Sequence, residues 1–391
     1  MTDAGIPLSN YQNEIYLAGL LGQVPAHPLS MAALRKAATR ALHPDARDYL
    51  EGAAGSEDTL RANLEAFRRW RIVPRMLRDV GTRDLRRTVL GTDMPAPLLV
   101  APIGVQSILH PDGELATARA AASLGVPMVA STAASHSMEE IAQAGGDAPR
   151  WYQLYWPRGE ELAASFVSRA EAAGYRAIVV TLDTAILGYR PRDLQRGYLP
   201  FLHSIGIQNY LSDPVFRAAL AKPPEEDPQA AVGHFVGLFA NPAVTWDDLS
   251  WLREQTSLPI VLKGVLHPDD AREAVARGVD GVIVSNHGGR QVDGAIAALD
   301  ALPGVVDAAS SDLEVLFDSG IRGGADVLKA LALGARAALV GRPAMWGLAV
   351  GGEAGVRAVL RGLLAELDLT LALSGLARVD DVDRSALTRI D

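Results

Sequence analysis

Residues Ala274–Ser285, with the sequence AVARGVDGVIVS, contain the pattern that decides the fold. An alanine-rich helix end is followed by Gly278, and glycine readily adopts the left-handed conformation that ends many helices. The apolar, β-branched run Gly281–Val284 comes next and is typical of a strand buried on both faces of a parallel sheet. The pattern therefore predicts a helix, a glycine cap and a buried strand that ends at Ser285.

The same pattern occurs elsewhere in the chain. Its other copies are Ala121–Gly125 leading to Ser131, Ala170–Gly174 leading to Thr181, and Ala330–Gly334 leading to Gly341. Strands of this kind are predicted near residues 97–102, 127–131, 151–155, 177–182, 259–263, 281–285, 314–318 and 336–341. Repetition of helix, glycine and strand indicates repeated βα units, which build α/β proteins with a parallel sheet.

Eight such strands predict a closed (β/α)8 TIM barrel. Amphipathic helices are predicted between them, among others over Gly113–Leu124, Glu160–Ala173, Pro268–Arg277 and Asp326–Leu333. An open, doubly wound sheet is the alternative fold. The glycine-rich dinucleotide-binding sequence that this alternative carries after its first strand is missing here.

The chain is predicted to be one barrel domain over residues 1–391 with two additions. Residues 1–95 are expected to form a helical extension that packs on the barrel. The fourth and fifth strands are separated by about 75 residues, much more than the usual connection. Residues 190–250 in this gap are predicted to be a lid insertion, and only its Pro/Glu-rich part, Lys222–Pro228, also fits a disordered linker.

Composition narrows the function classes. The chain has 49% hydrophobic and 21% charged residues, no cysteine and a net charge of −9. The absence of cysteine excludes disulfides and thiolate metal sites, and the acidic balance argues against nucleic-acid binding. Met1–Gln23 lacks the layout of a secretory signal, and Arg342 interrupts the apolar stretch Ala335–Gly352. We therefore expect a cytoplasmic protein with no membrane span.

In such a barrel the active-site residues come from the carboxyl ends of the strands, so the residues at these ends are the candidate site residues. They are Pro102, Ile103 and Gly104, Ser131, Gln153 and Tyr155, Thr181 and Asp183, Lys263, Ser285, His287 and Arg290, Asp318, and Gly341 and Arg342. By itself, the stretch Ser285–Gln291, SNHGGRQ, is best interpreted as a loop that happens to contain a histidine and an arginine. Its place in the repeated pattern favours a functional site.

Two of these strand ends are typical of a phosphate site. The stretch Asp318–Gly324, DSGIRGG, follows the seventh strand, and Gly341–Pro343 follows the eighth. Barrels commonly bind phosphate there, with backbone amides, glycines and a helix N-terminus. Arg322 or Arg342 would add charge-assisted hydrogen bonds. The alternative is that these glycines only make tight turns.

A second group of residues fits acid–base chemistry on a small anion. His287 is the candidate base, and Asp183 could orient it. Arg190 and Arg290 could grip a carboxylate, while Tyr49 and Tyr155 could bind the reacting oxygen. Lys263 could pair with a carboxylate, form a Schiff base or stabilise charge on a cofactor ring, and the neighbouring sequence does not decide between these. No paired spacing of metal ligands is present, so no metal is predicted.

At these residues the chain resembles a known family, and the likeness runs through nearly the whole chain. Ser285–Gln291, Asp318–Arg322 and Gly341–Arg342 resemble the signature and flavin phosphate site of the FMN-dependent 2-hydroxy-acid oxidases. Within that family, Tyr11–Tyr16, Ala101–Val105, Tyr189–Leu194 and the insertion after the fourth strand are similar to lactate 2-monooxygenases.

The resemblance implies a role for each candidate residue. FMN would contact Pro102, Ile103, Gly104, Ser131, Gln153, Thr181, Lys263, Ser285, Asp318, Gly320, Arg322, Gly341 and Arg342. His287 would take a proton from the substrate with Asp183 behind it, and Lys263 would stabilise charge on the reduced flavin. Arg190, Arg290, Tyr49 and Tyr155 would hold the substrate.

The implied reaction is oxidation of L-lactate with O2 to acetate, CO2 and water. The nearest alternative is an oxidase that releases keto acid and H2O2, with a larger aryl or aliphatic hydroxy acid as a possible substrate. A dehydrogenase with another electron acceptor ranks third, and a phosphate-binding barrel without redox chemistry is the alternative from a different class. The resemblance also implies a homo-oligomer, either a tetramer or an octamer.

Overall fold

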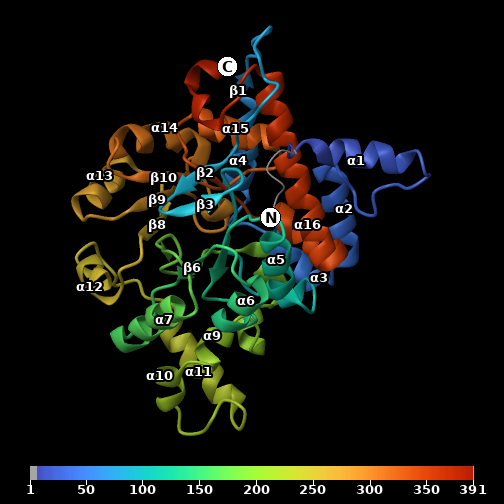
Figure 1. Cartoon of the computed structure of the whole chain (residues 1–391). Helices are drawn as coiled ribbons and strands as arrows, with labels where there is room; N and C mark the ends of the chain where they lie inside the picture. The colour runs from blue at the N-terminus through green and yellow to red at the C-terminus, as the bar shows by residue number, and fades with distance from the viewer. Residues whose placement is uncertain (1–6, 391) are drawn as a thin grey trace.

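Eight parallel strands close into a barrel in the computed structural model, which describes residues 7–390 (Figure 1). They are β4 (Leu98–Val100), β5 (Met128–Ser131), β6 (Arg150–Leu154), β7 (Ile178–Thr181), β8 (Ile260–Val265), β9 (Gly281–Val284), β10 (Glu314–Phe317) and β11 (Ala338–Val340). Around the barrel they follow chain order, with β11 next to β4. The predicted TIM barrel is confirmed, and each predicted strand overlaps one of these. Residues 1–6 and 391 of the predicted domain lie outside the described residues.

The predicted helices of the repeat are present on the outside of the barrel. They are α5 (Gly113–Ala122), α7 (Glu160–Ala172), α13 (Pro268–Ala276) and α15 (Gly324–Ala332), and α6 (Met138–Gly145), α12 (Asp248–Gln255) and α14 (Ala298–Ala309) lie in the same ring. The glycine after each repeated helix has positive φ: 66° at Gly125, 75° at Gly174, 66° at Gly278 and 109° at Gly334. These residues therefore end the helices as predicted, because only glycine adopts that conformation without steric cost.

Side chains alternate between two apolar layers along each strand. In β9, Val282 and Val284 pack outward against helices, while Ile283 packs in the barrel interior. A hairpin of β2 (Arg87–Val89) and β3 (Thr92–Met94) adds side chains to this interior layer. Trp151, near the start of β6, donates its indole N–H to Thr92 Oγ1 at 2.9 Å. The hairpin thus covers the amino-terminal ends of the strands and leaves their carboxyl ends for the site.

The N-terminal extension is helical in large part but not throughout. Its helices are α1 (Asn10–Gly19), α2 (Met31–Ala41), α3 (Pro44–Glu51) and α4 (Asp58–Arg68). It also contains the β2–β3 hairpin and β1 (Trp70–Ile72), which pairs antiparallel with β12 (Leu387–Arg389) at the other end of the chain. The expectation of an all-helical extension missed these strands, because each has only three residues and the partner of β1 is remote.

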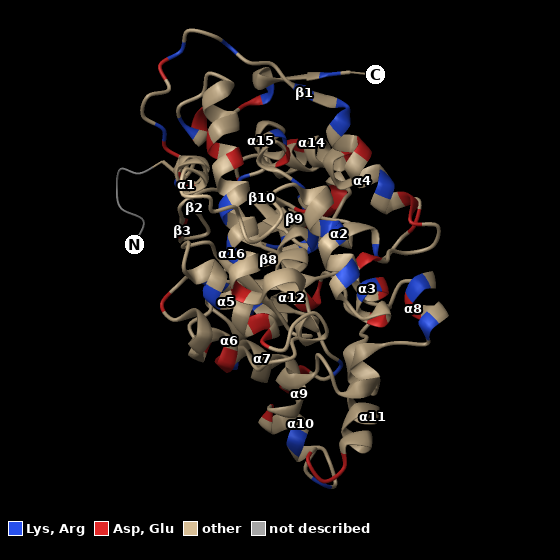
Figure 2. Ribbon diagram, turned by 90° about the vertical axis from the view of Figure 1, so that its right-hand side faces the viewer, with Lys and Arg blue, Asp and Glu red and all other residues tan. Residues whose placement is uncertain are grey.

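Short helices fill most of the insertion after β7. They are α8 (Pro191–Arg196), η2 (Pro200–His203), α9 (Gln208–Leu211), α10 (Pro214–Ala218) and α11 (Pro228–Phe239). Figure 2 shows α9, α10 and α11 together at one end of the molecule, and α8 beside α3. Aromatic rings hold the group together, with Phe235 packed on Tyr210 at 4.9 Å and on Phe239 at 5.0 Å between ring centroids. The insertion therefore has its own small core.

The last long helix, α16 (Arg342–Leu373), begins directly after β11 and packs against α5 and α2. It bends where Gly351 and Gly352 leave helical geometry. Within residues 7–390, neither α16 nor another helix is long and apolar enough to cross a bilayer.

Candidate active site

One cavity opens at the carboxyl ends of the barrel strands. It encloses about 1170 Å³ of space between protein atoms, part of it continuous with solvent. Most of the candidate residues line it: Tyr49, Pro102, Ile103, Gly104, Tyr155, Arg190, Lys263, His287, Arg290, Asp318, Gly320, Arg322, Gly341 and Arg342. The remaining candidates, Ser131, Gln153, Thr181, Asp183 and Ser285, lie in contact with these or at the next strand end. Parallel strands bring residues from distant parts of the chain to one rim.

Lys263 lies at the centre of a buried polar group on the cavity floor. Its Nζ donates to Ser285 Oγ at 3.0 Å and lies 3.5 Å from Asp318 Oδ2 and 4.0 Å from Asp183 Oδ2. Burial by itself lowers the pKa of Lys263, but the two carboxylates outweigh burial and raise it. The side chain is therefore an ammonium ion, which excludes a neutral amine ready for Schiff-base formation.

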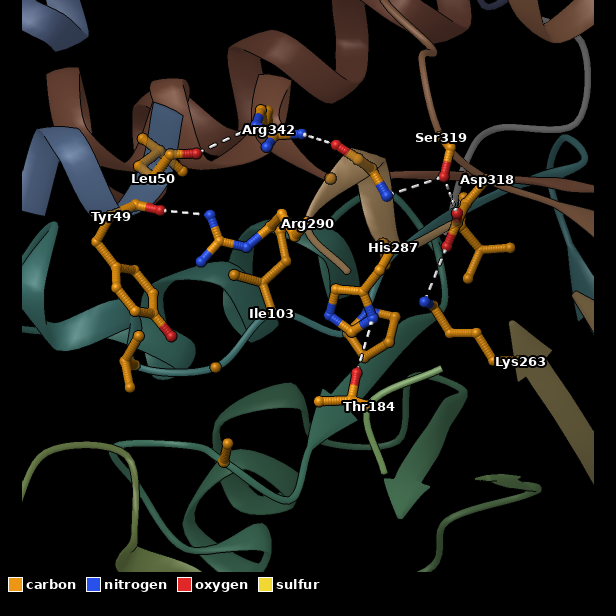
Figure 3. A pocket seen from close by; sticks show the side chains of 18 of the residues that line it. Tyr49, Leu50, Ile103, Thr184, Lys263, His287, Arg290, Asp318, Ser319 and Arg342 are labelled. Carbon is orange, nitrogen blue, oxygen red and sulfur yellow. Dashed lines mark hydrogen bonds and ion pairs between the residues drawn. The ribbon is translucent and has the colours of Figure 1, made fainter. Parts of the chain in front are cut away.

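His287 is held in one orientation by its backbone and by a carboxylate. Its ring Nδ1 lies 2.7 Å from Asp183 Oδ1. The same nitrogen lies 3.2 Å from Thr184 Oγ1, a contact that Figure 3 shows as a dashed line. Because Asp183 can only accept when ionised, Nδ1 carries the proton and Nε2 is left as the acceptor. Its backbone N–H donates to Ser285 Oγ at 3.1 Å, which connects it to the partner of Lys263.

The electrostatics of this pair favour a neutral base next to a charged carboxylate. Burial lowers the pKa of His287, and the charges of Lys263 and Arg190 lower it further against the opposing effect of Asp183. Burial raises the pKa of Asp183, but His287 and Lys263 overcome this and bring it to about 2. At neutral pH the imidazole can thus accept a proton, and Asp183 can stabilise the cation that results.

Two arginines line the cavity together with Tyr49 of α3 and with residues of the insertion after β7. Arg190 is buried, with Nη2 donating to Gln291 Oε1 at 2.7 Å, and burial together with the charge of Arg290 lowers its pKa to about 10. Arg290 donates through Nη1 to the carbonyl oxygens of Tyr49 and Gly52, both at 2.7 Å. Its guanidinium also lies over the Tyr49 ring at 4.9 Å (Figure 3). These contacts bring Tyr49, from the N-terminal extension, to the strand ends.

Two further arginines lie where α15 and α16 begin. Arg342 donates to the carbonyl oxygens of Leu50, Gly288 and Gly52 at 3.0–3.1 Å. Burial, with repulsion from Arg290 and Arg322, lowers the pKa of Arg342 to about 9. Arg322 lies over the Trp346 ring at 5.1 Å, and burial lowers its pKa to about 10. Two buried guanidinium groups beside two helix N-termini form a site that favours an anion.

Behind the lining residues, the carboxyl-terminal parts of β5, β6 and β7 contain side-chain amide and hydroxyl groups. Ser131 Oγ donates to Gln153 Oε1 at 2.9 Å, which fixes the orientation of the amide. Among the described residues, the buried atoms Gln153 Nε2 and Thr181 Oγ1 have no hydrogen-bond partner. Burial raises the pKa of Tyr155, which lines the cavity above them, to about 12. Buried polar atoms without a partner are costly, so these atoms indicate a polar ligand edge.

Comparison with known proteins agrees with this arrangement. The family model described as FMN-dependent dehydrogenase matches residues 38–389. The L-lactate oxidase of Lysinibacillus sphaericus is 41% identical over 378 residues, covering 97% of each chain. The human 2-hydroxyacid oxidase 1 is 45% identical over 345 residues, covering 88% of this chain and 91% of the relative. A crystal structure of mandelate oxidase superposes with a TM-score of 0.82 at 41% identity, covering 93% and 98% of the two chains.

The chain belongs to the FMN-dependent 2-hydroxy-acid oxidase family. FMN is therefore its cofactor, and the cavity can be tested for its fit. The arginines at α15 and α16 supply charge for a phosphate, and the unpartnered atoms of Gln153 and Thr181 supply donors for a polar ring edge. Lys263 supplies a buried positive charge between these two regions. The residues present thus fit a flat, phosphorylated ring system.

Several residues around the FMN cavity were not singled out from the sequence. Thr184 contacts both members of the His287–Asp183 pair, and its position directly after Asp183 was the available signal. Gln291 holds Arg190 and donates to the Asp183 carbonyl oxygen at 2.6 Å. Phe201 and Phe239 line the outer wall. Both aromatic residues belong to the insertion, where no strand pattern indicated which side chains turn inward.

Proposed function

We propose that this enzyme oxidises an L-2-hydroxy acid, with L-lactate as its preferred substrate and O2 as the final electron acceptor. The observation that carries the proposal is the His287–Asp183 pair, which faces the same cavity as the ammonium of Lys263 and the guanidinium groups of Arg190 and Arg290. A base, a fixed cation and a carboxylate-binding pair are the groups that oxidation of a hydroxy acid requires.

Arg190 and Arg290 bind the substrate carboxylate in this proposal. Both side chains are held by backbone or amide oxygens, so little side-chain entropy remains to be lost when the substrate binds. Tyr49 and Tyr155 border the same space and orient the hydroxyl group. Because burial raises the pKa of Tyr155 to about 12, its phenol stays protonated and can donate a hydrogen bond.

His287 takes a proton from the bound substrate through Nε2. Asp183, already ionised, stabilises the imidazolium that forms. Bound FMN accepts the two electrons that the substrate loses. Lys263 would stabilise negative charge on the reduced cofactor ring, and its raised pKa favours this role among the three that the sequence left open.

We further propose that the keto acid is decarboxylated before it leaves, as in lactate 2-monooxygenases. H2O2 and pyruvate formed in one closed site react to acetate, CO2 and water, whereas an open site releases both. Support for this comes from the insertion, whose residues Phe201 and Phe239 cover the outer wall of the cavity. The second candidate is an oxidase that releases H2O2, because relatives at 41–45% identity are named L-lactate oxidase.

Aerobic turnover of L-lactate, with acetate, pyruvate and H2O2 measured together, tests both candidates. Acetate without H2O2 supports the monooxygenase. Equal amounts of pyruvate and H2O2 make the protein an oxidase, and no turnover of lactate with turnover of mandelate assigns a larger substrate. A homotetramer or homo-octamer and a cytoplasmic location remain predictions, which mass measurement in solution and cell fractionation can check.

A further inference from the structure

A buried carboxylate lies behind the loop that follows β4. Glu114, in the first turn of α5, is fully buried. Its Oε1 accepts from the backbone N–H groups of Gln106 and Ser135, both at 3.0 Å, and its Oε2 lies 3.0 Å from His136 Nδ1. Gln106 belongs to the loop after β4, and Ser135 and His136 belong to the loop after β5. One side chain therefore joins two loops that border the FMN cavity.

The first of these loops needs such support, because its backbone is strained. Val105 has φ of 52°, a left-handed conformation that is unfavourable for a β-branched residue. Its N–H donates to the Ala133 carbonyl oxygen at 2.9 Å, and Gln106 Nε2 donates to the Ile103 carbonyl oxygen at 3.0 Å. Strained conformations persist only where the surroundings fix them. Gln106 is itself held by Glu114, and Ala133 lies in the same loop as Ser135, the second partner of Glu114.

The result of this conformation is a pair of free donors at the cavity wall. Within the described residues, the backbone N–H groups of Ile103 and Gly104 make no hydrogen bond, and both residues line the cavity (Figure 3 labels Ile103). Preorganised N–H groups stabilise negative charge that develops beside them. A shift of this loop by a fraction of an ångström would change that stabilisation.

We propose that Glu114 is a positioning residue, which holds the Ile103–Val105 backbone against FMN, and that His136 controls the strength of this hold through its protonation. The proposal rests on the proposed function for its kinetic effects, but its effect on the cofactor does not depend on the substrate. A residue that acts only as a polar filler of the core would leave the properties of bound FMN unchanged.

His136 provides the counter-charge of Glu114. Its hydrogen bond with Glu114 raises the pKa of His136 above the usual 6.5, against burial, and Glu140 at the start of α6 and Asp112 before α5 add to the rise. Below this raised pKa the imidazolium neutralises the buried carboxylate. As pH rises through it, the carboxylate loses its cationic partner, and the hold on the loop weakens.

Glu114→Gln in the holoenzyme is the decisive variant, because it keeps the shape but removes the charge and one acceptor. We expect the reduction potential of FMN to fall and its visible absorption to change, because the Ile103 and Gly104 donors lose alignment. We also expect kcat to fall about tenfold with KM changed less than about twofold. Glu160→Gln is the matched control: Glu160 also lies in the first turn of a barrel helix but is exposed.

His136→Gln distinguishes an effect on the position of the loop from a failure to fold. Glutamine can still donate a hydrogen bond to Glu114 but cannot titrate. Reduction of FMN itself takes up a proton, so the measured potential is first corrected for this uptake. In the wild type, the corrected potential should fall with rising pH and show an inflection above pH 6.5, where His136 loses its proton. We expect this inflection to be absent in His136→Gln, even if Glu114→Gln fails to fold. An unchanged inflection in His136→Gln, or an unchanged potential in a folded Glu114→Gln, overturns the proposal. A wild type that never reduces its FMN with hydroxy acids refutes the proposed function alone.

Discussion

The two sides of the cavity are built in different ways. The inner side consists of strand ends, where Lys263 lies in β8, Ser285 and Asp318 directly follow the neighbouring strands β9 and β10, and Lys263 contacts both of them. The outer side comes from segments outside the barrel, namely Tyr49 from α3 and Phe201 and Phe239 from the insertion. Sheet register fixes the inner side, whereas packing between loops and helices fixes the outer side.

This difference separates the groups proposed to carry out the reaction from the groups proposed to control access to the cavity. Groups that must lie within a few tenths of an ångström of a reacting atom are on the rigid side, where a barrel strand positions each of them. Groups that decide what enters and when products leave are on the side that can change without disturbing the barrel. Substitutions on the inner side should therefore affect rate or cofactor affinity, and substitutions on the outer side should affect product distribution.

The largest effect is expected at His287. His287→Ala should lower the rate of FMN reduction by about a thousandfold with FMN still bound, because the general base is lost. Anaerobic stopped-flow measurement of FMN absorbance checks this. His287→Asn serves as a second variant, because His287 has φ of 57° and asparagine tolerates this conformation better than alanine.

His267 provides the control for this prediction. It caps α13 on the outside of the barrel and has an exposed side chain, so His267→Ala should reduce FMN at the wild-type rate. Near-normal reduction in both His287 variants would show that the base lies elsewhere and that the inner side does not hold the proton-transfer group.

The next largest effect is expected on cofactor affinity. In the predicted phosphate site, Arg342→Met would remove one charge-assisted contact, which is worth about 1.5–3 kcal/mol, so FMN affinity should fall about 10- to 100-fold. Fluorescence of FMN released on dilution measures the affinity. Arg357→Met, on the exposed face of the same helix, should have no effect. Equal affinity in the two variants would remove Arg342 from the phosphate site.

As the proposed base, His287 should set the pH dependence of kcat/KM, which reports ionisation in the free enzyme. The base must be neutral to accept a proton, and burial with the charges of Lys263 and Arg190 lowers its pKa below the usual 6.5. Activity should therefore be full at neutral pH and fall about tenfold per pH unit below that lowered pKa. Asp183→Asn should move this acid limb to lower pH, because the neighbouring negative charge that raises the pKa is lost. A limb that moves upward would contradict the assignment.

The same division explains how much the sequence could predict. Residues such as Lys263 and Asp318 follow strands with a strong apolar pattern, so their meeting at one rim followed from the barrel itself. The role of Gly320 could be predicted from its DSGIR stretch, and the structure gives it φ of 106° with Asn63 packed against it. Local patterns therefore sufficed on the inner side.

Outer-side residues could not be predicted in this way. Phe239 ends α11 more than 50 residues after the strand that precedes the insertion, and nothing in its neighbourhood distinguishes it from Phe235, which is buried in the aromatic core of the insertion. Glu114 was missed for a different reason. Acidic residues are common in the first turn of a helix, so its place in the sequence gave no signal, and its three partners come together only when the loops after β4 and β5 are folded.

The smallest effect is expected at Phe239, and it tests the outer side alone. Its ring packs on Tyr155 at 5.2 Å, and both residues also line a neighbouring cavity bounded by Trp156, Val244 and Trp246. Phe239→Ala should join the two cavities and let pyruvate and H2O2 escape before they react. We expect the ratio of pyruvate to acetate to rise a few-fold, with the rate of FMN reduction changed less than about twofold.

Val236→Ala is the matched control for Phe239, since it shortens an exposed side chain on the same helix. Product analysis of the wild type and both variants under the same O2 concentration distinguishes the possible outcomes. A raised ratio in Phe239→Ala alone supports an outer wall that retains the keto acid. If Phe239→Ala instead slows FMN reduction as strongly as an inner-side variant, the insertion helps to position the reacting groups, and the division between chemistry and access does not hold at this residue.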